Sequence, residues 1–272
     1  MSGWNKEYWQ GANPRAEKAK IHHNKMIAEY KNEILEAVNN TEIWDDSRVS
    51  SNNADISGEP SINVTNNDTV SQTMLENKGR TVVLNFASYK NPGGGFLKGS
   101  GAQEEALCHE SFLYEVLSNP ALSNYYEFNK AHNNQNLYTN RALYTPDVLF
   151  IKNGQKVKAD VITCASPNRM AYTKYTPNAS EEKNFNTLKR RIHFIGDIIR
   201  CHMTGDNPVT TAVLGAFGCG VFAQNPETVA KLFKEEFENT PIKTVYAVID
   251  KGGHSKEGAY AIFNRIFSQF TE

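Results

Sequence analysis

The sequence predicts an α/β fold with a substantially parallel sheet that helices cover on both faces. Apolar, β-branched runs alternate along the chain with helical stretches of about ten to twenty residues, which is the element order of α/β proteins. The runs 81–86 and 161–165 are nearly continuous, as expected of strands buried on both faces. Glycine-rich segments follow two of the predicted strands. Ligands bind at the carboxyl ends of strands in such sheets.

The N-terminal part is predicted to be a helix followed by a polar loop. Apolar side chains recur at helical spacing over residues 15–38, and the turn-rich stretch 41–60 is expected to be a loop. No composition shift indicates a domain boundary after residue 60. We therefore expect a helical extension with its loop over residues 1–60, packed on one core domain over residues 61–272.

The core is expected to alternate strands and helices. Strands are predicted at 61–65, 81–86, 147–152, 158–165, 210–215 and 243–250. Helices are predicted at 68–75, from about 102 to 117, and at 121–131, 180–203, 226–237 and 257–270. Asp68 and Ser180 have the side chains of helix N-caps, and Asn153-Gly154 is typical of a hairpin turn.

Composition and charge narrow the possible functions. The net charge of −1 argues against a protein whose main partner is bulk nucleic acid, because such proteins need a basic excess. The 4 cysteines form no CxxC pair and no cluster with zinc spacing, so no metal or other cofactor is expected. Without an apolar leader or a run of about 20 apolar residues, we expect a soluble, cytoplasmic monomer with no membrane partner, or a nuclear one in a eukaryote.

The segment 81–117 joins a strand, a glycine loop and the start of a helix. Gly93, Gly94 and Gly95 follow Asn91-Pro92 and give the backbone freedom to approach a ligand. Gln103-Glu104-Glu105 then falls in the first turn of the helix, where free N–H groups attract anions. Glutamates at this position can also do no more than complement the helix dipole.

The segment 213–222 repeats the order of strand, glycines and helix. Gly215, Gly218 and Gly220 would let successive N–H groups curl around a diphosphate. The spacing alone is common in turns. Cys219 is expected to be a small buried residue and not a nucleophile, and Phe222 is consistent with a core position.

Together these residues resemble the bacterial-type (microbial) poly(ADP-ribose) glycohydrolases, a branch of the macrodomain fold. The triple glycine, a gap of seven residues and Gln103-Glu104-Glu105 match the catalytic signature of that family, as do the flanking Asn91-Pro92 and Ala106-Leu107. The segment 215–222 resembles the family's diphosphate loop. The likeness extends over roughly residues 15–270. It implies a macrodomain-like three-layer α/β/α fold with a mixed, largely parallel sheet.

The resemblance also implies roles for individual residues. Glu105 would be the acid/base that hydrolyses a ribose–ribose O-glycosidic bond, and Glu104 would bind and orient substrate hydroxyls. Asn91 would contact ribose hydroxyls, although a turn residue before proline explains it equally well, and Gln103 is either a capping residue or part of the catalytic loop. The expected substrate-binding set is Asn91, Gly93, Gly94, Gly95, Gln103, Gly215, Ala216, Phe217, Gly218, Cys219, Gly220, Val221 and Phe222, the last packing against the distal ribose.

The leading interpretation is an exo-type poly(ADP-ribose) glycohydrolase that releases ADP-ribose from polymer ends. An alternative enzyme removes a single ADP-ribose from a modified protein or nucleic acid. A non-catalytic ADP-ribose-binding macrodomain would keep the second loop and need not keep both glutamates. A nucleotide phosphatase or transferase is disfavoured, because the chain has no GxxxxGK[ST] and no GxSxG.

Overall fold

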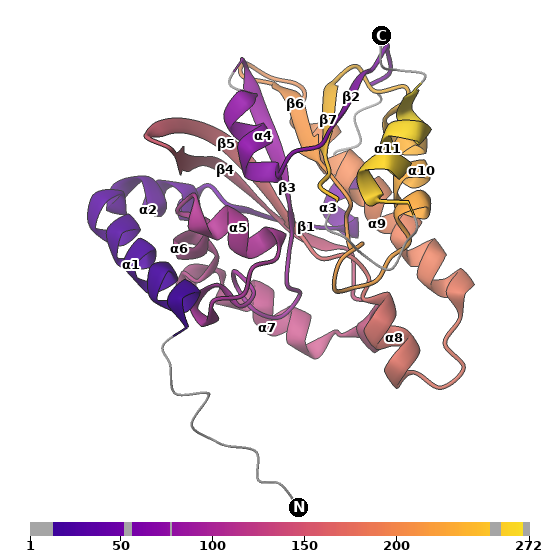
Figure 1. Ribbon diagram of the computed structural model, residues 1–272, viewed down its shortest axis with the longest axis horizontal. Coiled ribbons are helices and arrows are strands. Elements are labelled where there is room, and N and C mark those ends of the chain that lie inside the picture. Colours follow the sequence, from indigo (N-terminus) through magenta and orange to yellow (C-terminus); the bar gives the residue numbers. More distant parts are fainter. Residues whose placement is uncertain (1–12, 52–55, 77, 251–256, 269–272) are drawn as a thin grey trace, which may run out of the picture.

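The computed structural model describes residues 13–51, 56–76, 78–250 and 257–268 and arranges them in three layers (Figure 1). The middle layer is a seven-stranded sheet with the strand order β1-β4-β5-β3-β6-β7-β2. The β1/β4 and β4/β5 pairs are antiparallel, and the other pairs are parallel. The predicted mixed, largely parallel sheet is confirmed.

The elements have the following bounds. The strands are β1 (Glu42–Asp45), β2 (Ser61–Thr65), β3 (Arg80–Phe86), β4 (Arg141–Lys152), β5 (Gln155–Cys164), β6 (Val209–Leu214) and β7 (Lys243–Ala247). The helices are α1 (Pro14–Glu29), α2 (Lys31–Asn39), α3 (Asp46–Ser51), α4 (Thr69–Leu75), α5 (Gln103–His109), α6 (Leu113–Leu117), α7 (Ser123–Ala131), α8 (Arg169–Tyr175), α9 (Glu181–Cys201), α10 (Pro226–Phe237) and α11 (Ala259–Phe267).

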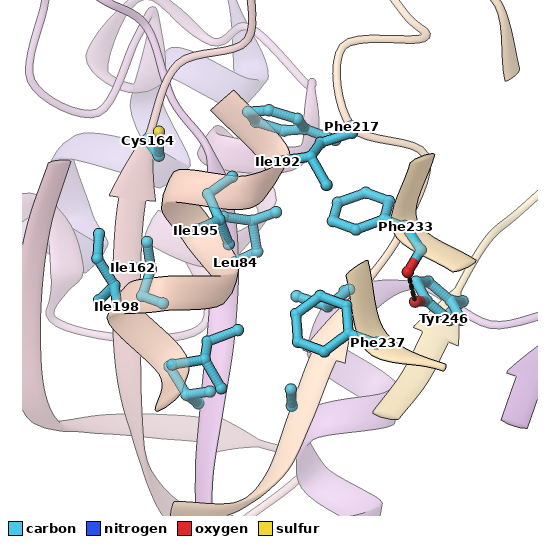
Figure 2. Packing of buried hydrophobic residues seen from close by; sticks show 14 of the residues in the cluster. Leu84, Ile162, Cys164, Ile192, Ile195, Ile198, Phe217, Phe233, Phe237 and Tyr246 are labelled. Carbon is cyan, nitrogen blue, oxygen red and sulfur yellow. Dashed lines mark hydrogen bonds between the residues drawn. The ribbon is translucent and has the colours of Figure 1, made fainter. Parts of the chain in front are cut away.

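Strand β3 lies at the centre of the sheet and is buried on both faces. Its Val82 and Leu84 pack with α9, α10 and α11, whereas Val83 belongs to a second core with α1, α2 and α4–α7. Strands β5 and β6 alternate in the same way, because successive side chains of a strand point to opposite faces. Figure 2 shows the first core, with Ile195 and Ile198 of α9 close to strand residues such as Ile162. The carboxyl end of β3 is thereby held between two packed layers.

Several predicted element starts are confirmed by their side-chain hydrogen bonds. Asp68 accepts a hydrogen bond from Ser71 N–H (2.9 Å) at the start of α4. Ser180 accepts one from Lys183 N–H (3.1 Å) at the start of α9. The hairpin turn is also confirmed: Gly154 has a φ of 79°, and β4 pairs with β5 directly beside it.

The N-terminal prediction was partly wrong. The single helix expected over 15–38 is two helices, because Tyr30 leaves the helical conformation (φ −129°, ψ 30°) and its ring is buried. The expected loop 41–60 contains β1 and α3. Strand β1 lies within the residues assigned to the extension, yet it pairs with β4 and forms one edge of the central sheet. Tertiary packing decides both features, and a short polar window does not reveal them.

The helix expected from 102 to 117 was also wrong in extent. It is split into α5 and α6, because the chain between them approaches the sheet, where Ser111 bridges Phe150 and Ile151 N–H donates to the carbonyl of Glu110 (2.6 Å). Strand β4 begins at residue 141, earlier than predicted, and helix α8 was not predicted. Strand β7 ends at residue 247, before the predicted 250, and residues 251–256 and 269–272 lie outside the described residues.

Candidate active site

The two glycine-rich loops leave neighbouring strands at the same edge of the sheet. We call residues 87–102 the catalytic loop and residues 215–224 the second loop. Strand β3, which precedes the first, pairs in parallel with β6, which precedes the second. The rings of Phe86 and Phe217 lie 5.7 Å apart between centroids. Gly215 must be a glycine here, because a Cβ would lie 2.6 Å from the carbonyl oxygen of Ala247.

An aromatic bridge, formed by Tyr89, Tyr138 and Phe222, connects the two loops. Tyr89 of the catalytic loop stacks on Tyr138, with centroids 4.1 Å apart. Tyr138 meets the edge of Phe222 in the second loop at 6.1 Å. Tyr89 is fixed in turn by a hydrogen bond from its hydroxyl to the carbonyl of His132 (3.0 Å). The loops that the sequence singled out are therefore held side by side.

The sequence pattern did not predict this bridge. Its middle residue, Tyr138, has a φ of 64° and follows a short run of left-handed residues, Asn134, Gln135 and Asn136. Side chains other than glycine rarely adopt this conformation, and asparagine tolerates it best. The asparagine-rich stretch before Tyr138 was the signal that could have marked an unusual loop.

Glu104 is a buried carboxyl at the base of the catalytic loop, with 3% of its surface exposed. It accepts hydrogen bonds from Ser88 N–H (2.7 Å) and from Asn85 Nδ2 (3.3 Å). Burial raises the pKa of Glu104 to about 8 against these hydrogen bonds, and the neighbouring Glu105 raises it further. Asn85 is a neighbour of this carboxyl that we did not predict. Its signal was a lone amide in an otherwise apolar strand.

The raised pKa of Glu104 makes the stability of the protein depend on pH. Because the folded state keeps this proton up to about pH 8 while the unfolded chain loses it near 4.5, the folded state binds more protons between these values. We expect the stability of wild type to fall relative to that of Glu104→Gln across this window, by at most about 1.4 kcal/mol per pH unit. Urea unfolding of both proteins from pH 5 to 8 measures this. Parallel curves would contradict it.

Glu105 lies beside Glu104 in the first turn of α5 and is 6% exposed. Its two oxygens accept hydrogen bonds from Gly95 N–H (2.8 Å) and Ala102 N–H (2.9 Å), so the middle and the end of the catalytic loop hold it. Gly94 lies against the carboxylates. A Cβ at Gly94 would be 2.5 Å from Glu105 Oε1. Among the described residues, the hydrogen bonds that orient this carboxyl all come from the backbone.

The other predicted residues in and after the catalytic loop are Gly93, the exposed Asn91 and Gln103, which forms hydrogen bonds to β3. Gln103 accepts a hydrogen bond from Phe86 N–H (2.8 Å) and donates to the carbonyl of Leu84 (2.9 Å), so it ties the start of α5 to the end of β3. This contact explains its place in the motif as an anchor of the catalytic helix. Gly93 has a φ of 62°, which favours glycine. Asn91 is exposed beside these groups.

The second loop offers unpaired donors. Several of its N–H groups have no acceptor in the part of the chain that the structure describes, namely those of Gly218, Gly220, Val221 and Phe222. Gly218 has a φ of 75° and lies against Ser166, whereas Gly220 faces open space. Consecutive free N–H groups in a turn form a concave site for an anion. Val221 is 73% exposed, so the loop is open to a ligand.

Other members of the second loop face the protein interior. The Phe217 ring is fully buried, so only its backbone is available to a ligand. Burial raises the pKa of the Cys219 thiol, which disfavours a nucleophilic thiolate. Gln224 fixes the end of the loop, because it donates to the carbonyl of Pro167 (2.8 Å) and exchanges hydrogen bonds with Asn184 of α9 (2.9 and 3.1 Å). Ala216 is half-buried.

Metal-binding residue types gather at one place among the described residues, on α9 and α10. Ligand atoms of His193, Asp197 and Glu236 lie within 4.8 Å of one another. Arg200 already pairs with Asp197 (2.5 Å) and Glu236 (2.6 Å), so its guanidinium supplies the positive charge between the two carboxylates.

No helix in the described parts of the chain is both long and apolar enough to cross a lipid bilayer.

Comparisons with known proteins show which family and which solved structures the chain resembles. The family model "Microbial-type PARG, catalytic domain" matches residues 16–153, which include the catalytic loop and both glutamates. The solved poly(ADP-ribose) glycohydrolase from Thermomonospora curvata is 26% identical over 93% of this chain and 99% of that one, with a TM-score of 0.78. The one from Deinococcus radiodurans in complex with ADP-ribose is 28% identical over 88% and 98%, with a TM-score of 0.72. A search among curated proteins gives no match. The predicted macrodomain-like fold is confirmed.

Proposed function

The chain belongs to the microbial-type poly(ADP-ribose) glycohydrolase family, and from this premise we propose that its two loops hold the terminal ADP-ribose unit of a polymer while Glu105 catalyses its release. The family makes the chain a glycoside hydrolase that acts on poly(ADP-ribose). One observation supports the residue roles: two buried carboxyls under the triple glycine lie beside a loop with unpaired N–H groups. A sugar joined to a diphosphate needs an acidic group at the sugar and anion-binding donors at the diphosphate.

Glu105 is the general acid and then the general base in this proposal. Its proton passes to the leaving oxygen, which belongs to the ribose of the preceding unit, as the bond from that oxygen to the anomeric carbon breaks. The ribose left behind has oxocarbenium character, which nearby negative charge stabilises. A water then adds its hydroxyl to the anomeric carbon and returns its proton to Glu105. The hydrogen bonds from Gly95 and Ala102 hold the carboxyl in place throughout.

Glu104 binds a ribose hydroxyl of the terminal unit and orients the ring. Its raised pKa, due to burial, keeps a proton on it at neutral pH, so it can donate a hydrogen bond as well as accept one. Hydrogen bonds from the Asn85 amide and from Ser88 N–H hold the Glu104 carboxyl in position. Asn91, exposed just before Pro92 and the triple glycine, contacts ribose hydroxyls in the same proposal.

The second loop binds the diphosphate through its unpaired N–H groups. Binding by backbone donors needs no cationic side chain, because N–H dipoles aimed at one point already favour negative charge. Phe222 packs against the distal ribose in this proposal, and the Tyr138 ring contacts the phenyl ring of Phe222. Backbone groups from both loops complete the proposed ADP-ribose site, and they belong to Gly93, Gly94, Gly215, Ala216, Phe217 and Cys219.

Product analysis tests the proposal. Wild type is incubated with end-labelled polymer and, separately, with a protein that carries single ADP-ribose groups. An exo-type enzyme yields free ADP-ribose from the first time points, with no early pool of short oligomers. Early oligomers would indicate internal cleavage, and release only from the mono-modified protein would contradict the proposal. ADP-ribose binding by calorimetry without any turnover would indicate a reader.

A further inference from the structure

A hollow of about 630 Å³ lies beside the catalytic loop, and none of its lining residues belongs to the second loop. Ser100 and Gly101 of the catalytic loop border one end, between α1 and α5, which lie on the same side of the sheet in Figure 1. The start of α4 and the end of β4 border the other end, with Asp68 and Lys152. The hollow is therefore separate from the space that the two loops enclose.

Two cations from α1 face the end of the hollow that the catalytic loop borders. Arg15 and Lys18 are three residues apart and share one face of the helix. A Cβ on Gly101 would lie 2.7 Å from Arg15 Nη1, so the guanidinium lies directly against the loop backbone. Among the residues that the structure describes, no acidic side chain pairs with either cation. Both side chains are exposed and available to an anion.

The acidic residues of the hollow lie toward its other end. Lys152 Nζ lies 3.6 Å from Asp68 Oδ2 and donates a hydrogen bond to Ser71 (2.6 Å). Glu110 lines the hollow near Lys152, since the adjacent Ile151 donates to the Glu110 carbonyl. Within the described part of the chain, the positive charge of the hollow without an acidic partner is thus that of Arg15 and Lys18, and Arg15 lies against the catalytic loop.

This end of the hollow is close to the proposed chemistry. Gly101, which Arg15 covers, precedes Ala102, whose N–H holds Glu105 (2.9 Å). In poly(ADP-ribose) the bond to be cut joins the terminal ribose to the ribose of the preceding unit. Only that second ribose ring separates the bond from the next diphosphate. A dianion must therefore lie a short distance from Glu105 on the side of the leaving unit.

We propose that Arg15 and Lys18 form a subsite for the diphosphate of the polymer unit that precedes the one being released. The inference rests on the proposed function, because it places the leaving part of a polymer relative to Glu105. It gives the N-terminal helix a role in choosing the substrate: a polymer end reaches these cations, whereas a single ADP-ribose on a protein presents no second diphosphate to them.

The test compares two substrates that differ only in the leaving group. One is a short ADP-ribose polymer, and the other is an aryl glycoside of ADP-ribose, whose leaving group has no phosphate. For Arg15→Gln/Lys18→Gln we expect the KM for polymer to rise about 3- to 20-fold at low salt with kcat little changed. The KM for the aryl glycoside and the affinity for ADP-ribose stay as in wild type. Polymer binding is measured in a Glu105→Gln background, where the polymer is not cleaved. There the slope of log K against log salt concentration should become less steep by about one to two when both cations are replaced.

The control variant is Lys20→Gln/Lys31→Gln, which removes two exposed charges from α1 and α2 away from the hollow. It should leave both substrates unaffected. An unchanged KM for polymer in the Arg15/Lys18 variant would overturn the subsite. An equal loss on both substrates would also overturn it, since it would mean that the cations only brace the loop. If wild type cleaved the aryl glycoside but not polymer, the proposed function would fail instead, and the subsite with it.

Discussion

Replacing Glu105 with glutamine should reduce kcat for polymer hydrolysis by about a thousand-fold or more while ADP-ribose binding is kept. A positioned acid/base contributes roughly 10²- to 10⁴-fold, and here one group performs both proton transfers. The glutamine has the size of Glu105 but can neither give a proton to the leaving oxygen nor take one from water. The NH2 group of the new glutamine also faces a backbone N–H group, that of Gly95 or of Ala102, where Glu105 had an acceptor. Because two donors then oppose each other, a small loss in the free energy of unfolding is expected.

Single-turnover digestion of polymer and calorimetry with ADP-ribose measure the two effects separately. The matched control is Glu127→Gln, an exposed glutamate on α7 that should not alter either quantity. Turnover near that of wild type would remove Glu105 from the mechanism. A loss of ADP-ribose binding as large as the loss of turnover would mean that Glu105 supports the loop and is not the acid.

Adding a single methyl group at Gly94 should have the second-largest effect. Gly94 has a φ of 60°, and a Cβ would lie 2.5 Å from Glu105 Oε1 and 3.0 Å from Glu104 Oε2. Gly94→Ala must therefore displace both carboxyls or distort the triple glycine. We expect kcat to fall about a hundred-fold, because a displacement of about 1 Å in a catalytic group has effects of that size. The stability should fall by about 1–3 kcal/mol.

Gly154 provides the control for backbone strain. It has a φ of 79° in the hairpin turn, but a Cβ there would meet nothing within 4 Å. Gly154→Ala should lower the free energy of unfolding through the same kind of backbone strain as Gly94→Ala, and it should leave kcat unchanged. Urea unfolding and initial rates on polymer for both variants separate strain from displacement of the carboxyls. Equal kcat in the two variants would show that the close approach of Gly94 to Glu105 is not required.

Features that depend only on neighbouring residues could be predicted from the sequence. The strand of residues 81–86, the caps Asp68 and Ser180 and the hairpin at Asn153-Gly154 were all predicted, because each follows from the local backbone preference of a few side chains. Both glycine loops were found for the same reason. The fixed spacing of the triple glycine to two glutamates indicated the family.

The residues that surround the glutamates, in contrast, are set by contacts between distant segments. Adjacent residues on a helix point about 100° apart, yet Glu104 and Glu105 are both buried, because the triple glycine folds back over the first turn of α5. The hydrogen bonds from Asn85 and Ser88, and the pKa that burial raises, follow from that folding. The bridge through Tyr138 joins loops that are more than a hundred residues apart. No pattern within one segment specifies such a contact, since it depends on the pairing of β3 with β6.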